Sequence, residues 1–236
     1  FAGMYCGLLR NTCLFFFLIL ISSPLLSQEI QPLTEGLTPD IEATRINPSN
    51  PVIDGHYDDP MWNKDHLKFA SEFYQMDPDE GMPASESTKV AVVYDDAAIY
   101  FAFWNYDSEP DKIARQLVRR DRWAEADNIS IRIDPYHDHQ SGFRFDVNAS
   151  GVQRDMSLYN DTNSDTEWDG VWESAVKIYD WGWFAEVKIP YHCLRFPELE
   201  EHTWGVNFTR YISRKTESDW WAFSPSTEGG MVSRFG

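Results

Sequence analysis

Short segments in which hydrophobic and polar residues alternate make up most of the chain after residue 87. In NISIRID (128–134) three isoleucines alternate with Ser, Arg and Asp, which is the two-residue period of a strand with one buried face. Such segments separated by turn residues predict an all-β fold, an antiparallel β-sandwich of two packed sheets with about nine or ten strands. The other strand candidates are 88–94, 98–106, 143–148, 152–160, 171–179, 183–190, 204–214 and 219–224.

Turns and helices are predicted only in a few short segments of the chain. Hairpin turns are predicted at 95–96, 149–151 and 180–182, where Asp, Ser and Gly residues separate two strand segments. The segment 110–121 has a proline in its first turn and apolar residues at helical spacing, which predicts about two or three helical turns. About one more turn is expected near Pro60. No repeat and no linker after residue 50 divides the chain.

The first 27 residues have the organisation of a secretory signal peptide, which we expect to be a helix. Arg10 precedes the apolar run CLFFFLILI, and the breaking sequence SSPLLS follows it. The run is shorter than the roughly 18 residues of a membrane span. Leu25 is large for a cleavage site, so an uncleaved anchor is the alternative. Residues 28–46 are polar and without period, and they are expected to form a tether or an irregular lead-in strand.

Charge and cysteine content exclude some partners and bonds. The formal net charge of the chain is −18, and this would repel nucleic acid strongly, so no nucleic-acid partner is expected. Cys6 and Cys13 lie in the signal peptide, which leaves Cys193 alone in the mature chain. An exported protein with a single cysteine has no internal disulfide and depends on its hydrophobic core.

No catalytic motif is present. The chain has 38 acidic residues, so some pair of carboxylates would have glycosidase spacing in any case. Such a pair therefore does not indicate a glycosidase. A Ser-His-Asp elbow, a His-Glu-x-x-His motif and a glycine-rich phosphate loop are all missing from the sequence. The chain by itself is therefore predicted not to be an enzyme. His137 and His139 stand between two strand segments, where a solvated turn is favoured over a metal site.

Acidic loop residues raise the possibility of calcium binding. Asp107, Glu109 and Asp111 form one cluster after a strand, and Asp121, Glu125 and Asp127 form another. Calcium prefers several oxygen ligands. Neither cluster has the spacing of an EF-hand loop, and solvated acidic side chains are the alternative.

The ten tryptophans are candidates for core packing or for ligand stacking. Most of them lie within strand segments, where burial or sheet packing is expected. Trp62 follows turn residues and is predicted to close one end of the sandwich. Trp123 differs, since all of its near neighbours in RDRWAEAD are polar or small. Its indole either folds over the edge of the core or is available to a ligand.

Several motifs in sequence order carry a family resemblance. PVIDGHYDDPMW (51–62), TKVAVVYDDAAIYFAFWNYD (88–107), RWAEADNISIRID (122–134), FRFDVN (143–148), GWFAEVKIPY (182–191) and WGVNFTR (204–210) together resemble the family 9 carbohydrate-binding module. The resemblance defines a domain over residues 47–236. The combination looks most like the N-terminal family-9-like domain of outer-membrane-associated bacterial proteins, in which a long β-rich region follows. The family has a further strand after a Phe-Gly pair, so Phe235-Gly236 predicts a domain truncated before its last strand.

The resemblance implies a non-catalytic module that binds an oligosaccharide or the end of a polysaccharide chain. It also implies structural calcium and export to the periplasm, the outer membrane or the exterior of a Gram-negative bacterium. In the family a sugar is clamped between two tryptophans, and Trp123 matches the first. Arg144 matches a sugar-contacting arginine, and Asn148 and Asp127 are further candidate ligand-binding residues.

Two departures leave alternatives open. No tryptophan stands near Gly229 and Gly230, where the second clamp residue is expected, and Ser130 replaces a sugar-binding glutamate. Trp220 or Trp221 could substitute, although both align with a core strand. The first alternative is a structural or interaction module that packs against a following outer-membrane β-region and binds sugar weakly or not at all. A glycoside hydrolase is the second.

Overall fold

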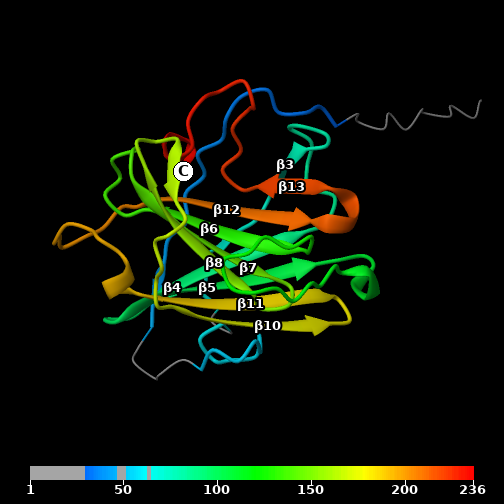
Figure 1. Cartoon of the computed structure of the whole chain (residues 1–236), viewed down its shortest axis with the longest axis horizontal. Helices are drawn as coiled ribbons and strands as arrows, with labels where there is room; N and C mark the ends of the chain where they lie inside the picture. Colours follow the sequence, from blue (N-terminus) through cyan, green and yellow to red (C-terminus); the bar gives the residue numbers. More distant parts are fainter. Residues whose placement is uncertain (1–29, 47–51, 63–64) are drawn as a thin grey trace, which may run out of the picture. The chain divides into compact units, whose positions relative to one another are not determined.

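Two β-sheets pack face to face in the computed structural model, which describes residues 30–46, 52–62 and 65–236 (Figure 1). The predicted signal peptide, residues 1–27, lies outside the described residues, and residues 31–236 form one compact unit. The first sheet has six strands in the order β1-β4-β5-β11-β10, with β2 also paired to β4. The second has seven strands in the order β3-β13-β12-β6-β7-β8-β9.

The bounds of the elements follow. The six-stranded sheet contains β1 (Thr44–Arg45), β2 (Phe69–Ala70), β4 (Thr88–Tyr94), β5 (Ala98–Tyr106), β10 (Glu173–Tyr179) and β11 (Gly182–Pro190). The seven-stranded sheet contains β3 (Tyr74–Asp77), β6 (Asn128–Asp134), β7 (Gly142–Asn148), β8 (Gln153–Tyr159), β9 (Asn163–Asp165), β12 (Gly205–Ile212) and β13 (Glu217–Trp220). The described residues also contain four 3-10 helices, namely η1 (Pro110–Lys112), η2 (Tyr191–Cys193), η3 (Ser213–Lys215) and η4 (Val232–Arg234).

The predicted all-β sandwich is confirmed. Strands β4, β5 and β6 have the bounds that alternation predicted. The last predicted strand, 219–224, is displaced, because pairing ends at Trp220 and the chain then turns away. The strands that alternation did not predict, β1, β2, β3 and β9, have only two to four residues, too few for a recognisable period. Of these, β1 lies in the segment 28–46, where an irregular lead-in strand was one of the two expectations. Pairing is antiparallel throughout the described strands except between β1 and β4.

The helix predicted over 110–121 is wrong beyond its first turn. Only η1 is helical, and the chain then runs without regular structure to Arg119. Of the apolar residues there, Ile113 is buried in the core but Leu117 is 80% exposed, so a helix would bury little of its apolar face. The backbone instead contacts strand ends, with the Asp127 amide donating to the Ala114 carbonyl at 3.0 Å. None of the helical elements in the described residues is longer than three residues, and none has the character of a membrane span.

The core lies between the sheets. It contains the three isoleucines of β6 together with phenylalanines and tryptophans from both sheets, including Phe101, Phe103, Phe145, Trp183 and Phe208. Each of these residues is at most 1% exposed. The face of β6 that alternation predicted to be buried is therefore the buried one.

The outer face of the six-stranded sheet is covered by the chain before β2. Met61, Trp62 and Leu67 pack on residues of β4, β5 and β11. Trp62 Nε1 donates to the buried Glu186 carboxylate at 2.6 Å. Trp62 therefore seals this face and not an end of the sandwich, since its indole nitrogen has its partner in β11.

The outer face of the seven-stranded sheet is only partly covered. Val232 and Phe235, near the C-terminal end of the sequence, pack on Met156 and Leu158 of β8. The Asp161 carboxylate holds this segment by accepting from the amides of Met231 and Ser233 at 2.9 and 2.8 Å. The middle strands keep a polar and charged outer face.

Candidate functional site

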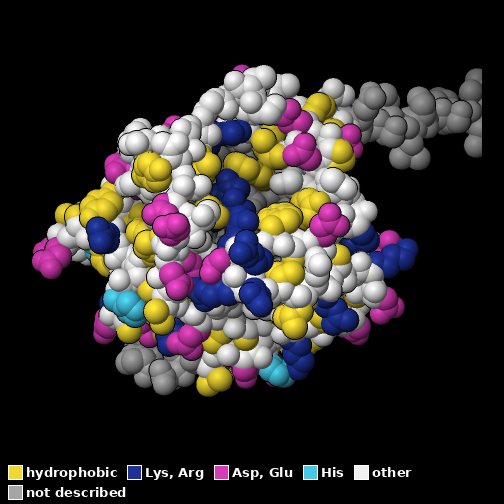
Figure 2. Space-filling view, viewed as in Figure 1, with side chains coloured by type: hydrophobic (Ala, Val, Ile, Leu, Met, Phe, Trp, Pro, Cys, Tyr) yellow, Lys and Arg dark blue, Asp and Glu magenta, His cyan; other side chains and the backbone are white. Residues whose placement is uncertain are grey.

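Charged side chains line the outer face of β6, β7 and β8. The two hairpins between these strands place Arg132 opposite Arg144, and Asp146 opposite Arg154. Their strand neighbours Ile131, Ile133, Phe145 and Val147 point into the core, so the charged residues point outward. Figure 2 shows Lys and Arg side chains gathered in a band over β12, β6, β7 and β8, with hydrophobic and acidic side chains beside it.

Trp123 lies at one end of this face, in the loop before β6. It is 57% exposed and is the only exposed tryptophan among the described residues. Its ring centroid lies 6.4 Å from that of Tyr211 in β12, and the Arg154 guanidinium lies 5.2 Å from the ring. Nearby, the Asp121 amide donates to the Gln153 carbonyl at 3.1 Å, which ties the loop to β8. A shallow hollow beside the indole is lined by Arg122, Trp123, Ala124, Asn128, Asp146, Asn148, Val152 and Arg154.

Asp146 links two arginines of this face. Its carboxylate accepts from Arg144 Nε at 2.8 Å and from Arg154 Nε at 3.0 Å. Burial would raise the pKa of Asp146, but the two guanidinium groups outweigh burial and lower it. The carboxylate is therefore ionised at neutral pH and orients both arginines.

Arg144 is half-buried and has hydrogen-bonding capacity left for a ligand. Among the described residues, only its Nε is hydrogen bonded. A guanidinium group carries five N–H donors in a planar fork, so the terminal nitrogens can reach a pair of sugar hydroxyls. The structure thus brings Trp123 and Arg144 to the same face, joined through Arg154 and Asp146.

Asn148 lies at the rim of the hollow, but its amide serves the backbone. Its Oδ1 accepts from the amides of Ser150 and Val152, both at 2.9 Å. Its Nδ2 donates to the Gln116 carbonyl at 3.0 Å. The turn also needs Gly151, whose φ of +79° is strained for other residues. Asn148 therefore positions the loop beside Trp123 and has one N–H left for a ligand.

Asp127 does not belong to this face. It precedes β6 and is fully buried. Its Oδ1 accepts from the Ser213 amide at 3.1 Å, while its Oδ2 has no hydrogen-bond partner among the described residues. Burial raises the pKa of Asp127. Because it lies one residue before the outward-facing Asn128, it points to the other side of the sheet, out of reach of a ligand on Trp123.

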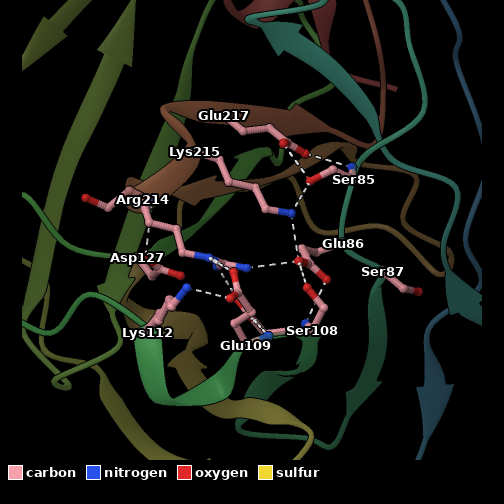
Figure 3. A network of polar contacts seen from close by, with 12 residues as sticks. Ser85, Glu86, Ser87, Ser108, Glu109, Lys112, Asp127, Arg214, Lys215 and Glu217 are labelled. Atoms are coloured by element: carbon pink, nitrogen blue, oxygen red, sulfur yellow. Dashed lines mark hydrogen bonds and ion pairs between the residues drawn. The ribbon is translucent and has the colours of Figure 1, made fainter.

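The acidic cluster proposed for calcium is bound by basic side chains (Figure 3). Arg214 Nη1 donates to Asp107 Oδ2 at 2.6 Å, and Arg214 Nε lies 3.6 Å from Glu109 Oε2. Lys112 Nζ donates to Glu109 at 2.6 Å. Asp111 is exposed. No group of three or more His, Cys, Asp or Glu side chains in the described part of the chain is arranged to hold a metal ion. These carboxylates do not fit a calcium ion, and calcium binding stays a prediction.

Glu86 belongs to the same network. It accepts from Lys215 Nζ at 2.7 Å and from Arg214 Nη2 at 2.9 Å (Figure 3). Burial opposes ionisation, but the bonds from Lys215 and Ser108 lower the pKa of Glu86 to about 2. The network therefore links the chain before β4 and the chain after β5 to η3 by ion pairs.

Trp220, the last residue of β13, and Trp221, which follows it, face opposite ways. Trp221 is buried, and its ring centroid lies 5.3 Å from that of Phe208 in the core. Trp220 is half-buried on the outer face, with the guanidinium of Arg132 4.2 Å from its ring and that of Arg234 5.4 Å away. Of the two substitutes considered for the second clamp residue, only Trp220 shares a face with Arg144.

Sequence reasoning missed Arg132 and Arg154. The signal for Arg132 was available, since it alternates with the core residues Ile131 and Ile133. Arg154 lies between the polar residues Gln153 and Asp155, so alternation does not tell which face of β8 it occupies. Trp220 was interpreted as a core residue, because the pair of tryptophans has no alternation that tells which one faces outward.

Comparisons with solved structures identify proteins of the same fold. A family 9 carbohydrate-binding module from Caldicellulosiruptor kristjanssonii, solved with cellotriose, has 17% identity and a TM-score of 0.56, over 83% of this chain and 91% of that chain. A family 9 module from the same organism, solved with glucose, has 17% identity and a TM-score of 0.55, over 83% and 93%. A candidate carbohydrate-binding protein from Bacteroides uniformis has 11% identity and a TM-score of 0.67, over 86% and 98%. No protein-family model and no curated protein matches the chain.

Proposed function

We propose that this chain is a non-catalytic carbohydrate-binding module that stacks a sugar ring on Trp123. The observation that carries the proposal is the 57% exposed indole beside Arg154, which Asp146 links to Arg144. A large aromatic side chain in a polar loop gains from covering its face. The fold supports the proposal, because the solved structures that share it include modules in complex with cellotriose and glucose.

The geometry suits a sugar in two ways. The apolar face of a pyranose can lie on the indole, which contributes about 1–3 kcal/mol by analogy with base stacking on aromatic side chains. Arg144 can then donate to neighbouring hydroxyls with its terminal nitrogens. Asp146 holds the guanidinium in place before the ligand arrives, which reduces the entropy lost on binding.

The ligand class is an oligosaccharide or the end of a polysaccharide chain. The predicted signal peptide and the resemblance to outer-membrane-associated proteins support the proposal that this module is part of a larger exported protein of a Gram-negative bacterium. Polysaccharide binding or breakdown is the process that we assign to that protein. A following outer-membrane β-region is part of the same proposal.

The test is Trp123→Ala in affinity electrophoresis against soluble plant polysaccharides, with calorimetric titration of cellotriose. We expect retention to disappear and the melting temperature to change by less than about 2 °C, because an exposed side chain adds little to stability. The matched control is Tyr136→Ala. Tyr136 is also exposed, at 49%, but it follows the opposite end of β6. Its replacement should leave retention unchanged.

Two outcomes would contradict the proposal. A wild-type chain that binds no member of a glycan array would favour the structural or interaction module. A fall in melting temperature of more than about 5 °C for Trp123→Ala would indicate that the indole packs against the edge of the core.

Arg144 provides an independent test. Arg144→Gln removes the charge and the fork of donors, and we expect affinity to fall about tenfold, as for the loss of a hydrogen bond to a charged group. Asn148→Ala should instead lower the melting temperature, because the amide of Asn148 holds the turn and the loop at Gln116. Equal loss of stability in both variants would contradict the separate roles.

A further inference from the structure

Guanidinium groups from distant parts of the chain meet beside Trp220. Arg132 from β6 and Arg234 from η4 both contact the indole, with their guanidinium carbons 4.2 and 5.4 Å from its ring centroid. Arg144 from β7 is the cross-strand partner of Arg132, and directly opposed residues have Cβ atoms within about 5.5 Å of each other. Like charges at such distances repel, so the arrangement requires an explanation.

Of these three arginines, Arg132 has the fewest interactions that offset its positive charge. It is only 8% exposed, and its Nε is buried without a hydrogen-bond partner in the described part of the chain. Arg144 and Arg234, by contrast, donate to Asp146 and to the oxygens of Ser224 and Pro225. Burial, Arg144 and Arg234 lower the pKa of Arg132 to about 9, against a smaller opposing effect of Asp146. Burying a cation whose N–H donors make no hydrogen bonds costs free energy, unless a ligand accepts hydrogen bonds from them.

The carboxylates of this face are already engaged. Asp146 bonds Arg144 and Arg154. Asp134, further along β6, accepts from the amides of Tyr136 and His139 at 3.2 and 2.8 Å and so holds the turn after the strand. Neither carboxylate forms an ion pair with Arg132. Positive charge is therefore in excess beside Trp220.

This excess is local. The chain as a whole has a net charge of −18, and the basic band in Figure 2 is bordered by acidic side chains. A long polyanion would meet repulsion outside the band. A short oligosaccharide that carries a few negative groups among neutral hydroxyls would fit within the band.

The occupant that fits is an acidic sugar. A planar carboxylate matches the fork of a guanidinium group, and the exposed Trp123 on the same face offers a surface for a pyranose ring. We infer that the outer face of the seven-stranded sheet binds an oligosaccharide with anionic groups, with Arg132 and Arg144 receiving one such group beside Trp220. This inference rests on the proposed sugar-binding function and adds the class of sugar.

The test compares ligands that differ only in charge. Oligogalacturonate and its methyl ester have the same sugar rings, but the ester lacks the negative charge. We expect the acid to bind at least about tenfold more tightly than the ester, since a hydrogen bond to a charged group contributes that much. The difference should shrink at high salt, because screening weakens the pairing. A sulfated oligosaccharide, titrated in parallel, tells a carboxylate site from a sulfate site.

The variant is Arg132→Gln, and the control is Arg195→Gln, in an exposed loop between β11 and β12. Arg132→Gln should remove the preference for the acid over the ester and keep the affinity for cellotriose. Arg195→Gln carries the same charge change and should keep the preference. Melting temperatures establish that both variants are folded. If Arg132→Gln is not folded, Arg144→Gln is titrated with the same ligand pair, and it should lose the preference for the acid in addition to its loss of affinity for cellotriose.

Each other outcome overturns the inference in a recognisable way. Equal affinity for acid and ester, with Trp123→Ala weakening both, overturns the anionic class and leaves sugar binding intact. Polyglutamate that binds as tightly as oligogalacturonate would show that the band recognises an acidic protein surface. Binding of neither the two galacturonides nor cellotriose overturns both proposals.

Discussion

The guanidinium carbon of Arg132 lies 4.2 Å from the ring centroid of Trp220, and this contact joins β6 to β13 across the intervening strand β12. Contacts of this kind contribute about 0.5–2 kcal/mol. The contact holds the indole on the outer face, beside the small residues Ser130 and Thr209. Arg132 therefore takes part both in the packing of Trp220 and in the proposed ligand site.

Arg132→Met should stabilise the protein. Methionine preserves most of the volume and removes a buried charge that has no ion-pair partner among the described residues, and such replacements commonly gain about 1 kcal/mol or more. The free energy of unfolding, measured by urea denaturation, is expected to rise while affinity for oligogalacturonate falls. A loss of more than about 1 kcal/mol would show that the contact with Trp220 outweighs the cost of burial.

Asp219→Asn should change how stability depends on pH. Asp219 is fully buried in β13 and paired in register with Arg210, and both of its carboxylate oxygens lack a hydrogen-bond partner among the described residues. Burial and the Glu217 carboxylate raise the pKa of Asp219 to about 8, against opposing effects of Arg210 and Lys215. In the unfolded chain the same group ionises near its ordinary pKa of about 3.9.

The raised pKa sets the direction of the effect. Between about pH 4 and pH 8 the folded state holds a proton that the unfolded state has lost, so this group reduces stability by up to about 1.4 kcal/mol for each unit of rising pH. Asparagine has no such proton. The free energy of unfolding of Asp219→Asn, relative to wild type, should therefore increase from pH 5 to pH 8. A difference that stays constant over this range, as expected for the exposed Asp111→Asn, would contradict the assignment.

Arg214→Met should be strongly destabilising. It would leave Asp107 and Glu86 without their bonds to the guanidinium group, which are 2.6 and 2.9 Å long. Removing one partner of a buried ion pair costs about 3 kcal/mol. Lys112→Gln, which breaks an exposed pair with Glu109 in the same network (Figure 3), should cost less than about 1 kcal/mol. Similar losses in urea denaturation for both variants would contradict this distinction.

Removal of divalent metal tests the calcium prediction. Since Arg214 and Lys112 already bind the carboxylates of Asp107 and Glu109, excess EDTA should shift the melting temperature by less than about 1 °C. An increase of several degrees with millimolar calcium would support structural calcium, as the family resemblance implies, with ligands other than this pair.

The alternation of hydrophobic and polar residues was sufficient to predict much of the fold. The three isoleucines of β6 and the phenylalanines of β7 define the buried faces of their strands, and Arg132 and Arg144 then point to the opposite side. The short turn at 149–151 makes β7 and β8 neighbours, so a basic outer face could be predicted from the sequence. Trp123 was recognisable as unusual because its neighbours in the chain are polar.

The chain after η1 shows where local patterns fail. Its apolar residues have helical spacing, but only Ile113 reaches the core. Helices in proteins are stabilised chiefly by packing of the apolar face, so the backbone follows the strand ends instead. The same limit applies to Asp107 and Glu109, whose partner Arg214 lies more than 100 residues away in the sequence.

The sequence by itself determined that the chain forms a β-sandwich, which faces of its long strands are buried, and that Trp123 stands apart from the core pattern. Tertiary structure decided that Trp220 faces outward while Trp221 packs in the core, and that Asp127 is buried while Asn128 is beside the candidate site. The physical reason is register. A shift of one residue moves every side chain of a strand to the other face, and only the pairing of β13 with β12 and β3 determines that register.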